Sequence, residues 1–373
     1  MTETFKSDTE IDTHLQKAAS VAINEVLGTK KDEKVLIITN PDEDVKSISM
    51  ALYDAAFEVG AKPVLIFQPV KTQLDFAEES VISAIESNPD IILSISKQKL
   101  GKDKKALKNP YKVGDKEYDS TFHYLLNEKK ARSFWSPSVT AKMFAETVPI
   151  DYAELKDTCI KIKDELDRAQ EVHITAPSGT DILIGLRGRE AKSDDGNFTE
   201  MGKGGNLPCG EVFISPELGA SHGTIGFDGS ISLEGGEIII ESPIIAEVND
   251  GFVTKISGKD EADKLKNTVD KAEGTVRDFV SSGKLPKEAE ESYIKNARNL
   301  GELGIGLNKN AEIVGNMLED EKVYGTCHIA IGSNYDEDAK SLIHLDGLIK
   351  KPTIRVKYED GREKDIIRDG EVL

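Results

Sequence analysis

Hydrophobic residues in the first half of the chain fall into short continuous runs, and these runs alternate with stretches of helical spacing. Strands that are apolar on both faces and alternate with helices are typical of a parallel sheet covered on both sides. We therefore expect an α/β domain with a mostly parallel sheet. The predicted strands are 35–41, 61–69, 90–96 and 133–140, and the predicted helices are 10–27, 44–59, 74–88 and 151–169.

The pattern changes near residue 171, where apolar and polar positions begin to alternate along short segments separated by glycines. Alternation indicates strands with one buried face, as in an antiparallel sheet. A helix is predicted at 259–282, and Asn249 to Gly251 reads as a hairpin turn. We therefore predict two domains, an α/β domain at 1–168 and an α+β domain at 169–373 with a curved antiparallel sheet.

A lysine-rich segment at 97–116 interrupts the first domain and contains Gly101, Pro110 and Gly114. Its composition indicates a solvated loop. The alternative is a contact with an anion or with the end of a substrate, because open α/β sheets bind ligands at the carboxyl ends of their strands. No glycine-rich phosphate-binding motif follows any predicted strand, so the first domain has no nucleotide signature.

The chain of 373 residues carries a net charge of −19 and has a pI near 4.9. Such an acidic surface repels phosphates, which argues against nucleic acid or an anionic membrane as a partner. The amino terminus lacks the apolar core of a secretory leader, and no stretch reaches the ~18 apolar residues of a membrane span. We therefore expect a cytoplasmic protein, and its three cysteines without paired spacing fit a reducing compartment.

The most distinctive chemistry lies at 325–346, in the sequence GTCHIAIGSNYDEDAKSLIHLD. His344 and Asp346 are two positions apart, so on a strand both side chains point to the same face. His328 lies in its own short apolar run, and Gly332 can turn that run back toward the second strand. One hairpin would then present three metal ligands.

Two upstream segments each place a single glutamate among glycine, proline and apolar residues. Glu211 lies in NLPCGEVFISP at 206–216, and Glu302 lies in NLGELGIGLN at 299–308. A carboxylate in apolar surroundings needs a partner, because burying an unpaired charge costs several kcal/mol. A metal ion would be such a partner.

Together these segments resemble the ligand motifs of the thermophilic metalloaminopeptidase family, of the aminopeptidase T and aminopeptidase S type. The resemblance follows the family's order from about residue 178 to residue 373. It implies an aminopeptidase that releases the first residue of short peptides through a metal-activated water, with Tyr335 as catalytic residue, and it implies a homodimer. The implied ligands of two divalent ions, zinc, cobalt or manganese, are Glu211, Glu302, His328, His344 and Asp346.

One position departs from the family pattern, since many members have two adjacent glutamates where this chain has Gly210 before Glu211. The residue that would act as general base is therefore unassigned. Two other functions stay open. One is a ring-cleaving dioxygenase with a single ferrous ion, related to the pyridine-diol dioxygenases, in which a glutamate joins His344 and Asp346. The other is a metal-binding protein without catalysis.

Overall fold

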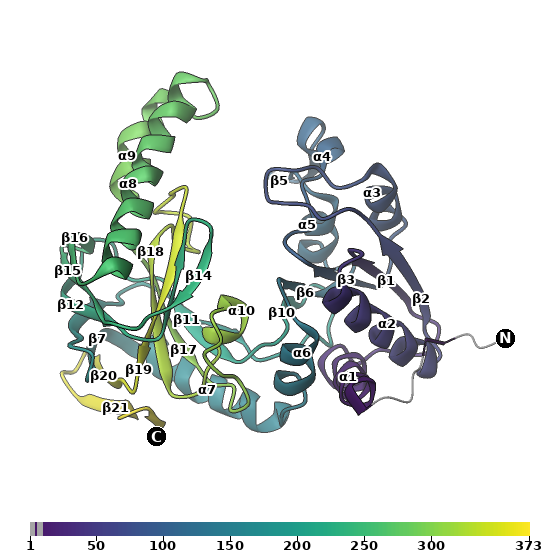
Figure 1. Cartoon of the computed structure of the whole chain (residues 1–373), viewed down its shortest axis with the longest axis horizontal. Helices are drawn as coiled ribbons and strands as arrows, with labels where there is room; N and C mark the ends of the chain where they lie inside the picture. Colours follow the sequence, from purple (N-terminus) through teal and green to yellow (C-terminus); the bar gives the residue numbers. More distant parts are fainter. Residues whose placement is uncertain (1–3, 6–9) are drawn as a thin grey trace. The chain divides into compact units, whose positions relative to one another are not determined.

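The computed structural model describes residues 4–5 and 10–373, and the described chain forms two compact units (Figure 1). Unit 1 comprises Met1–Lys156 and Asp194–Cys209, and unit 2 comprises Asp157–Ser193 and Gly210–Leu373. The chain therefore returns to unit 1 once after it has entered unit 2. Within the described ranges, no helix is both long enough and apolar enough to cross a membrane.

The described residues of unit 1 form a five-stranded parallel sheet in the order β10-β6-β3-β1-β2. The expectation of a mostly parallel α/β unit is confirmed. The strands are β1 (Lys34–Thr39), β2 (Lys62–Phe67), β3 (Ile91–Ser96), β6 (Arg132–Pro137) and β10 (Gly204–Asn206). The helices are α1 (Glu10–Val21), which continues as a π-helical turn at Ala22–Val26, α2 (Glu43–Glu58), α3 (Glu79–Glu86), α5 (Thr121–Asn127) and α6 (Ala141–Thr147).

Helices cover both faces of this sheet, as continuous apolar strands require. On one face α3 and α5 bury Val81, Ile85 and Leu125 against Leu36 and Ile92 of the central strands. On the other face α2 packs on β1 and β3 and is itself contacted by α1 and α6. The interior of unit 1 is therefore built from β1 and β3, every position of which is buried except Lys34.

The segment predicted as a plain loop at 97–116 is more ordered than its composition indicates. It contains the short helix α4 (Lys104–Lys108) and the first strand of the hairpin β4 (Tyr111–Val113) and β5 (Lys116–Tyr118). Asp103 begins α4 by accepting hydrogen bonds from the backbone nitrogens of Lys105 and Ala106. The loop prediction is thus wrong for α4 and the hairpin strands, whereas the segment is largely exposed, as expected.

The expectation of antiparallel sheet in unit 2 is confirmed, and its described strands divide between two such sheets. The seven-stranded sheet has the order β14-β13-β19-β18-β17-β11-β9 and the eight-stranded sheet has the order β16-β15-β12-β8-β7-β20-β21-β22. The strands of the first are β9 (Lys192–Asp194), β11 (Glu211–Ile214), β13 (Ser230–Leu233), β14 (Gly236–Ile239), β17 (Leu300–Gly306), β18 (Thr326–Gly332) and β19 (His344–Lys350). The strands of the second are β7 (Ala169–Thr175), β8 (Asp181–Gly185), β12 (Ser221–Phe227), β15 (Ile244–Asn249), β16 (Phe252–Ser257), β20 (Thr353–Tyr358), β21 (Glu363–Arg368) and β22 (Glu371–Val372).

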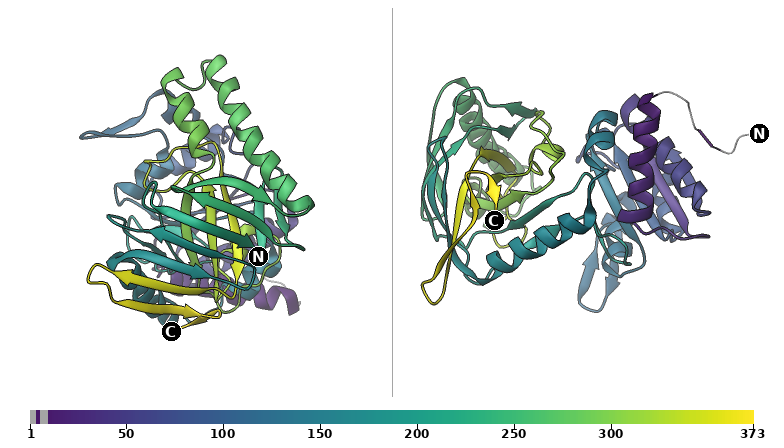
Figure 2. Two further views of the ribbon diagram at one scale, coloured as in Figure 1. Left: turned by 90° about the vertical axis from the view of Figure 1, so that its left-hand side faces the viewer. Right: turned by 90° about the horizontal axis from the view of Figure 1, so that it is seen from below.

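The two sheets of unit 2 lie face to face (Figure 2). A Cβ atom added to Gly347 of β19 would lie 2.5 Å from the Phe227 ring of the opposite sheet, so the glycine permits this close contact. The amphipathic helix α8 (Asp260–Ser281) contacts β13, β15 and β16. The remaining helices are α7 (Tyr152–Arg168), which crosses from unit 1 into unit 2, the 3-10 turn Lys287–Ala289, α9 (Glu290–Asn296) and α10 (Met317–Asp320).

A buried arginine joins the opening helix of unit 1 to its sheet. Arg132, at the start of β6, is 2% exposed and donates from Nε to the Leu27 carbonyl at 2.8 Å. Its two terminal nitrogens donate to the two carboxylate oxygens of Glu33, at 3.0 and 2.6 Å. This paired geometry is the strongest form of an arginine–carboxylate contact.

We predict that Arg132→Met lowers the free energy of unfolding of unit 1 by about 3 kcal/mol, because Glu33 and the Leu27 carbonyl lose their shared partner. Urea denaturation followed by Trp135 fluorescence measures the change. The double variant Arg132→Met/Glu33→Leu should recover most of the loss, since no charge is then left unpaired. Equal stability of the single and double variants would contradict this explanation.

Candidate metal centre

Four neighbouring strands of the seven-stranded sheet carry the predicted ligands. Glu211 begins β11, Glu302 lies on β17, His328 on β18, and His344 and Asp346 on β19. The order of these strands in the sheet is β19-β18-β17-β11, so the motifs lie side by side although they span 136 positions of the sequence from Glu211 to Asp346. The structure brings all five residues together.

The register of the strands places these side chains on one face. Directly opposite residues of antiparallel strands share a face, and Glu302, Ala330 and Asp346 form one such row. In the next row Gly304 lies opposite His328. The small side chain of Ala330 separates the two carboxylates, and the absent side chain of Gly304 leaves room for the His328 ring.

The histidine and carboxylate atoms converge within short distances. Glu302 Oε1 lies 3.3 Å from His328 Nε2, and Glu302 Oε2 lies 3.2 Å from His344 Nε2. Asp346 Oδ1 also lies 3.2 Å from His344 Nε2. Among the described residues, Glu302, His344 and Asp346 form a group whose ligand atoms all lie within 4.8 Å of one another.

The orientation of His344 indicates a cation. Its Nδ1 lies 2.8 Å from the Ser333 carbonyl oxygen, an acceptor, so Nδ1 carries the hydrogen and donates it. In the neutral ring Nε2 then presents a lone pair, and this lone pair faces two carboxylate oxygens. Ligating histidines characteristically donate their second nitrogen to a carbonyl or carboxylate in this way. The lone pairs repel unless a proton or a metal ion lies among them.

Buried atoms without hydrogen bonds support the same conclusion. Of the described buried side-chain atoms, those lacking a hydrogen-bond partner include Glu211 Oε2, His328 Nδ1 and Asp346 Oδ1. Buried polar atoms are normally paired, because an unpaired one costs about 1–3 kcal/mol. The donor set of two imidazoles and several carboxylates therefore fits a divalent transition-metal ion.

The electrostatics of the cluster favour positive charge. Burial raises the pKa of Glu211 to about 8. Burial also lowers the pKa of His328, but its contact with Glu302 and the charges of the other carboxylates prevail and raise it to about 9. Burial raises the pKa of Asp346, but the charge and hydrogen bond of His344, together with the charges of His328 and Lys322, prevail and lower it to about 2. Without metal the histidines thus hold protons that a metal ion would replace.

A second group contains one residue, Glu321, that the sequence analysis did not select, and another unselected residue lies beside it. Glu211, His328 and Glu321 also lie close enough to hold a metal ion. Beside them is Lys322, fully buried, whose Nζ lies 2.5 Å from Glu211 Oε1 and 2.6 Å from Glu321 Oε1. Glu321 and Lys322 directly follow α10, in the charged run LEDEK. Such a run normally indicates a solvated face, so the pattern offered no sign of burial.

The backbone explains why Gly210 cannot be exchanged freely for the second glutamate of the family motif. Gly210 has φ +124°, in the region that favours glycine. A Cβ atom added there would lie 2.8 Å from Asn308 Cβ. The backbone conformation at position 210 and the packing of Asn308 therefore both disfavour a glutamate side chain there.

Tyr335 lies beside the cluster on the connection between β18 and β19. Its ring centroid is 5.2 Å from that of His344 and 5.1 Å from that of Phe213, although the residue is 52% exposed. Desolvation and the charges of Glu302 and Asp346 raise the pKa of the phenol, which therefore keeps its proton. The catalytic role of Tyr335 stays a prediction.

Ion pairs fix the segment that carries Tyr335. Arg189 donates to Asp336 at 3.1 Å and to Asp338 at 2.9 Å, and Lys192 donates to the Tyr335 carbonyl oxygen at 3.2 Å. Arg189 is largely buried, which strengthens these contacts. These contacts fix the backbone at Tyr335 and so hold its ring beside the candidate metal centre.

Comparisons with known proteins place the fold. The family model described as NicX: 2,5-dihydroxypyridine 5,6-dioxygenase matches residues 137–326. The structure of 2,5-dihydroxypyridine dioxygenase from Pseudomonas putida KT2440 is similar, with a TM-score of 0.68 and 16% identity over 97% of each chain. Wild-type AmpT from Thermus thermophilus has a TM-score of 0.62 and 21% identity, over 97% of this chain and 100% of that chain. No curated protein matches the sequence.

We predict that Gly304→Ala weakens metal binding about 10- to 100-fold, because its Cβ atom would lie 1.9 Å from His328 Nε2 and must displace the ring. Titration calorimetry of metal-free protein measures the affinity. The matched control is Gly274→Ala in α8, where an added Cβ meets nothing within 4 Å. The control should bind metal normally and gain about 0.5–1 kcal/mol in stability. Equal metal affinities of the two variants would show that His328 is not a metal ligand.

Proposed function

The chain belongs to the 2,5-dihydroxypyridine 5,6-dioxygenase family, whose model matches half of its length, and we propose that it is a single-metal dioxygenase. Its proposed substrate is a small hydroxylated nitrogen heteroaromatic ring. In the proposed reaction one ring bond is cleaved and both atoms of O2 enter the product, so no external reductant is consumed. The observation that carries the proposal is the buried ion pairing of Lys322.

Lys322 distinguishes the two candidate ligand groups. Its ammonium group already forms ion pairs with Glu211 and Glu321, the two carboxylates of one group. A dication placed there would be repelled by a buried charge in direct contact with its ligands. In the part of the chain that the structure describes, neither lysine nor arginine forms an ion pair with Glu302 or Asp346. One metal ion held by Glu302, His344 and Asp346 is therefore the favoured arrangement.

The group of Glu302, His344 and Asp346, together with the adjacent His328, has the donors that non-haem iron uses. His344 and His328 supply two imidazoles, and Glu302 with Asp346 supplies carboxylate. Two histidines and one carboxylate with open positions are characteristic of ferrous oxygenases. A ferrous ion supplies the one-electron chemistry that O2 needs to react with a closed-shell ring. The protein orients the ligands through the Ser333 carbonyl, which fixes the His344 ring.

Aromatic side chains beside the centre suit a planar substrate. Tyr335 lies next to His344 and Phe213 contacts Tyr335, and rings of this kind favour stacked or edge-on contacts with another ring. Lys192 Nζ lies 5.7 Å from the Tyr335 ring centroid, so a cation is also available near the site. A hydroxylated ring with partial negative charge on its oxygens matches this combination.

A two-metal aminopeptidase is the second candidate. It is favoured by the presence of two ligand groups that share one face, and by the structural likeness to AmpT. In that reaction two ions about 3.5–4 Å apart would activate water, and Tyr335 would donate a hydrogen bond to the developing oxyanion. The two functions differ in metal count, in metal identity and in the need for oxygen.

We predict that protein loaded with ferrous ion under nitrogen binds about one ion per chain and then consumes O2 when 2,5-dihydroxypyridine is added. Elemental analysis and an oxygen electrode measure the two quantities, and His344→Ala is the inactive control. Hydrolysis of short unblocked peptides with about two zinc, cobalt or manganese ions bound would instead establish the second candidate.

We predict that Lys322→Met raises the metal content from about one toward about two ions per chain, since Glu211 and Glu321 become free to bind a cation. The metal-free variant should lose about 3–5 kcal/mol of stability, because a buried carboxylate loses its partner, and added metal should restore it. Lys350→Met, at the exposed end of β19, is the matched control. An unchanged metal content in Lys322→Met would refute the argument from charge.

A further inference from the structure

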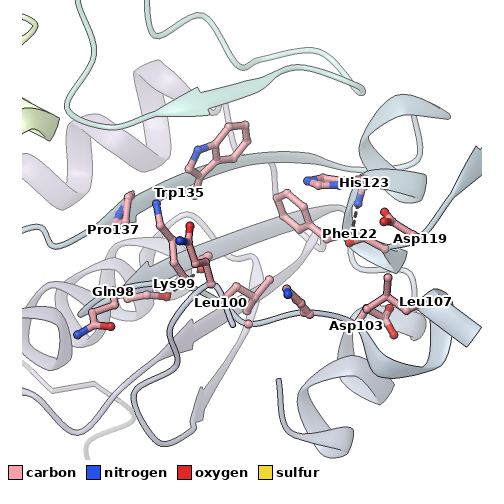
Figure 3. Close-up of a pocket in the computed structure, with 16 residues that line it drawn as sticks. Gln98, Lys99, Leu100, Asp103, Leu107, Asp119, Phe122, His123, Trp135 and Pro137 are labelled. Atoms are coloured by element: carbon pink, nitrogen blue, oxygen red, sulfur yellow. Dashed lines mark hydrogen bonds between the residues drawn. The ribbon is translucent and has the colours of Figure 1, made fainter. Parts of the chain in front are cut away.

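A half-open pocket of about 730 Å³ lies in unit 1, and it contains no residue of the metal centre (Figure 3). Its lining includes Ser94 and Ser96 at the end of β3 and Trp135 and Pro137 at the end of β6. These are the carboxyl ends of two neighbouring parallel strands, the edge at which open α/β sheets bind ligands. The volume is in the range of small-molecule sites.

Aromatic and aliphatic side chains form opposite walls of this pocket. Trp135 and His123 lie on one side, and Leu100 and Leu107 lie on the other (Figure 3). The edge of Phe122 meets the Trp135 ring, with centroids 5.9 Å apart and planes at 82°. Phe122 is buried, so it fixes the orientation of the indole. Such a lining suits a flat ring more than a flexible chain.

The floor of the pocket offers hydrogen bonding. Ser94 and Ser96 are both buried, point to the same face of β3, and have their hydroxyl oxygens 3.0 Å apart. Their mutual hydrogen bond uses one of their two hydroxyl hydrogens. The other remains able to donate to an acceptor in the pocket.

Positive charge lies on one wall. Lys99 and Lys102 line the pocket and are exposed. The carboxylate of Asp103 is engaged by the backbone of α4 and by both the nitrogen and the hydroxyl of Thr121. Asp119 lies away from Lys99, on the side of the pocket where Leu107 lies (Figure 3). An anion near Lys99 would therefore meet cations without a competing free carboxylate.

The wall that carries these lysines is fixed in advance. The backbone nitrogen of Lys99 donates to the Lys71 carbonyl at 2.9 Å, and that of Lys102 donates to the Asp75 carbonyl at 2.8 Å. Gln68, which is buried, donates to the Leu100 carbonyl at 2.8 Å. Gly101 has φ +94°, and an added Cβ atom would lie 2.7 Å from the Ala77 nitrogen. A preformed wall reduces the entropy cost of binding.

We propose that this pocket binds an aromatic carboxylate of one or two rings. The ring lies between Trp135 and Leu100, and the carboxylate accepts from the Ser94 and Ser96 pair and faces Lys99 and Lys102. The site is separate from the proposed reaction and does not depend on it. It gives a function to the lysine-rich segment that composition alone describes as a solvated loop.

Trp135 is the sole tryptophan of the chain, so its fluorescence reports on this pocket directly. Benzoate, used as the probe on the full-length protein, should change the emission along a saturable curve. Benzyl alcohol, which has the ring without the charge, should bind at least about tenfold more weakly, because charge-assisted hydrogen bonds are lost. Saturation-transfer NMR on benzoate measures the same binding without relying on the indole.

The double variant Lys99→Gln/Lys102→Gln should weaken benzoate binding about tenfold or more. Lys46→Gln, on the exposed surface of α2, is the matched control and should bind benzoate as the natural chain does. His344→Ala should also keep benzoate binding, so failure of the proposed function leaves this result intact. Any of three results would overturn the proposal. Benzoate and benzyl alcohol could bind with equal affinity, the double variant could bind benzoate as tightly as the natural chain, or neither method could detect saturable binding.

Discussion

Mutual repulsion among buried carboxylates is the constraint on which the arrangement of unit 2 depends. Glu211, Glu302 and Asp346 are each less than a tenth exposed, and Glu321 lies beside them. Each ionised carboxylate taken from water costs several kcal/mol, and neighbouring like charges add to that cost. Lys322 offsets part of the charge, and the histidines offset more when protonated. A metal ion would complete the balance, and its binding would then be coupled to the folding of this unit.

The seven-stranded sheet brings these carboxylates and histidines together by holding them on neighbouring strands. Every predicted ligand lies on a strand, and adjacent strands hold their residues in rows that the hydrogen-bond register fixes. Ligands on regular elements are positioned more precisely than ligands on loops. Gly304 and Ala330 matter for the same reason, since their small size leaves the space that imidazole and carboxylate groups occupy.

Local patterns in the sequence predicted the elements and much of the site, because they depend on neighbours along the chain. The two-residue spacing of His344 and Asp346 holds on β19, and the change from continuous to alternating apolar runs corresponds to the change from parallel to antiparallel sheets. The sequence did not predict Lys322, because its burial depends on an ion pair with Glu211, 111 positions away. The pocket at Trp135 was not predicted for a similar reason, since its walls come from four separate elements of the chain: β3, β6, α5 and the lysine-rich segment. The division into two sheets depends on long-range pairing such as β7 with β20, which no local pattern contains.

Gly210 and Lys322 together distinguish this site from one that has a second glutamate at position 210. The positive φ of Gly210 and the close approach of Asn308 exclude a side chain at that position. The neighbouring Glu211 is then held by an ammonium group, which satisfies one of its oxygens and leaves the other 3.4 Å from His328 Nε2. A carboxylate in this state serves to orient and charge-balance a histidine ligand. Fewer anionic ligands would also leave more of a bound metal's coordination sphere open. An open sphere favours chemistry in which both oxygen and an organic ring must approach one ion, whereas hydrolysis by two ions requires the group of Glu211, Glu321 and His328 to be free of the lysine.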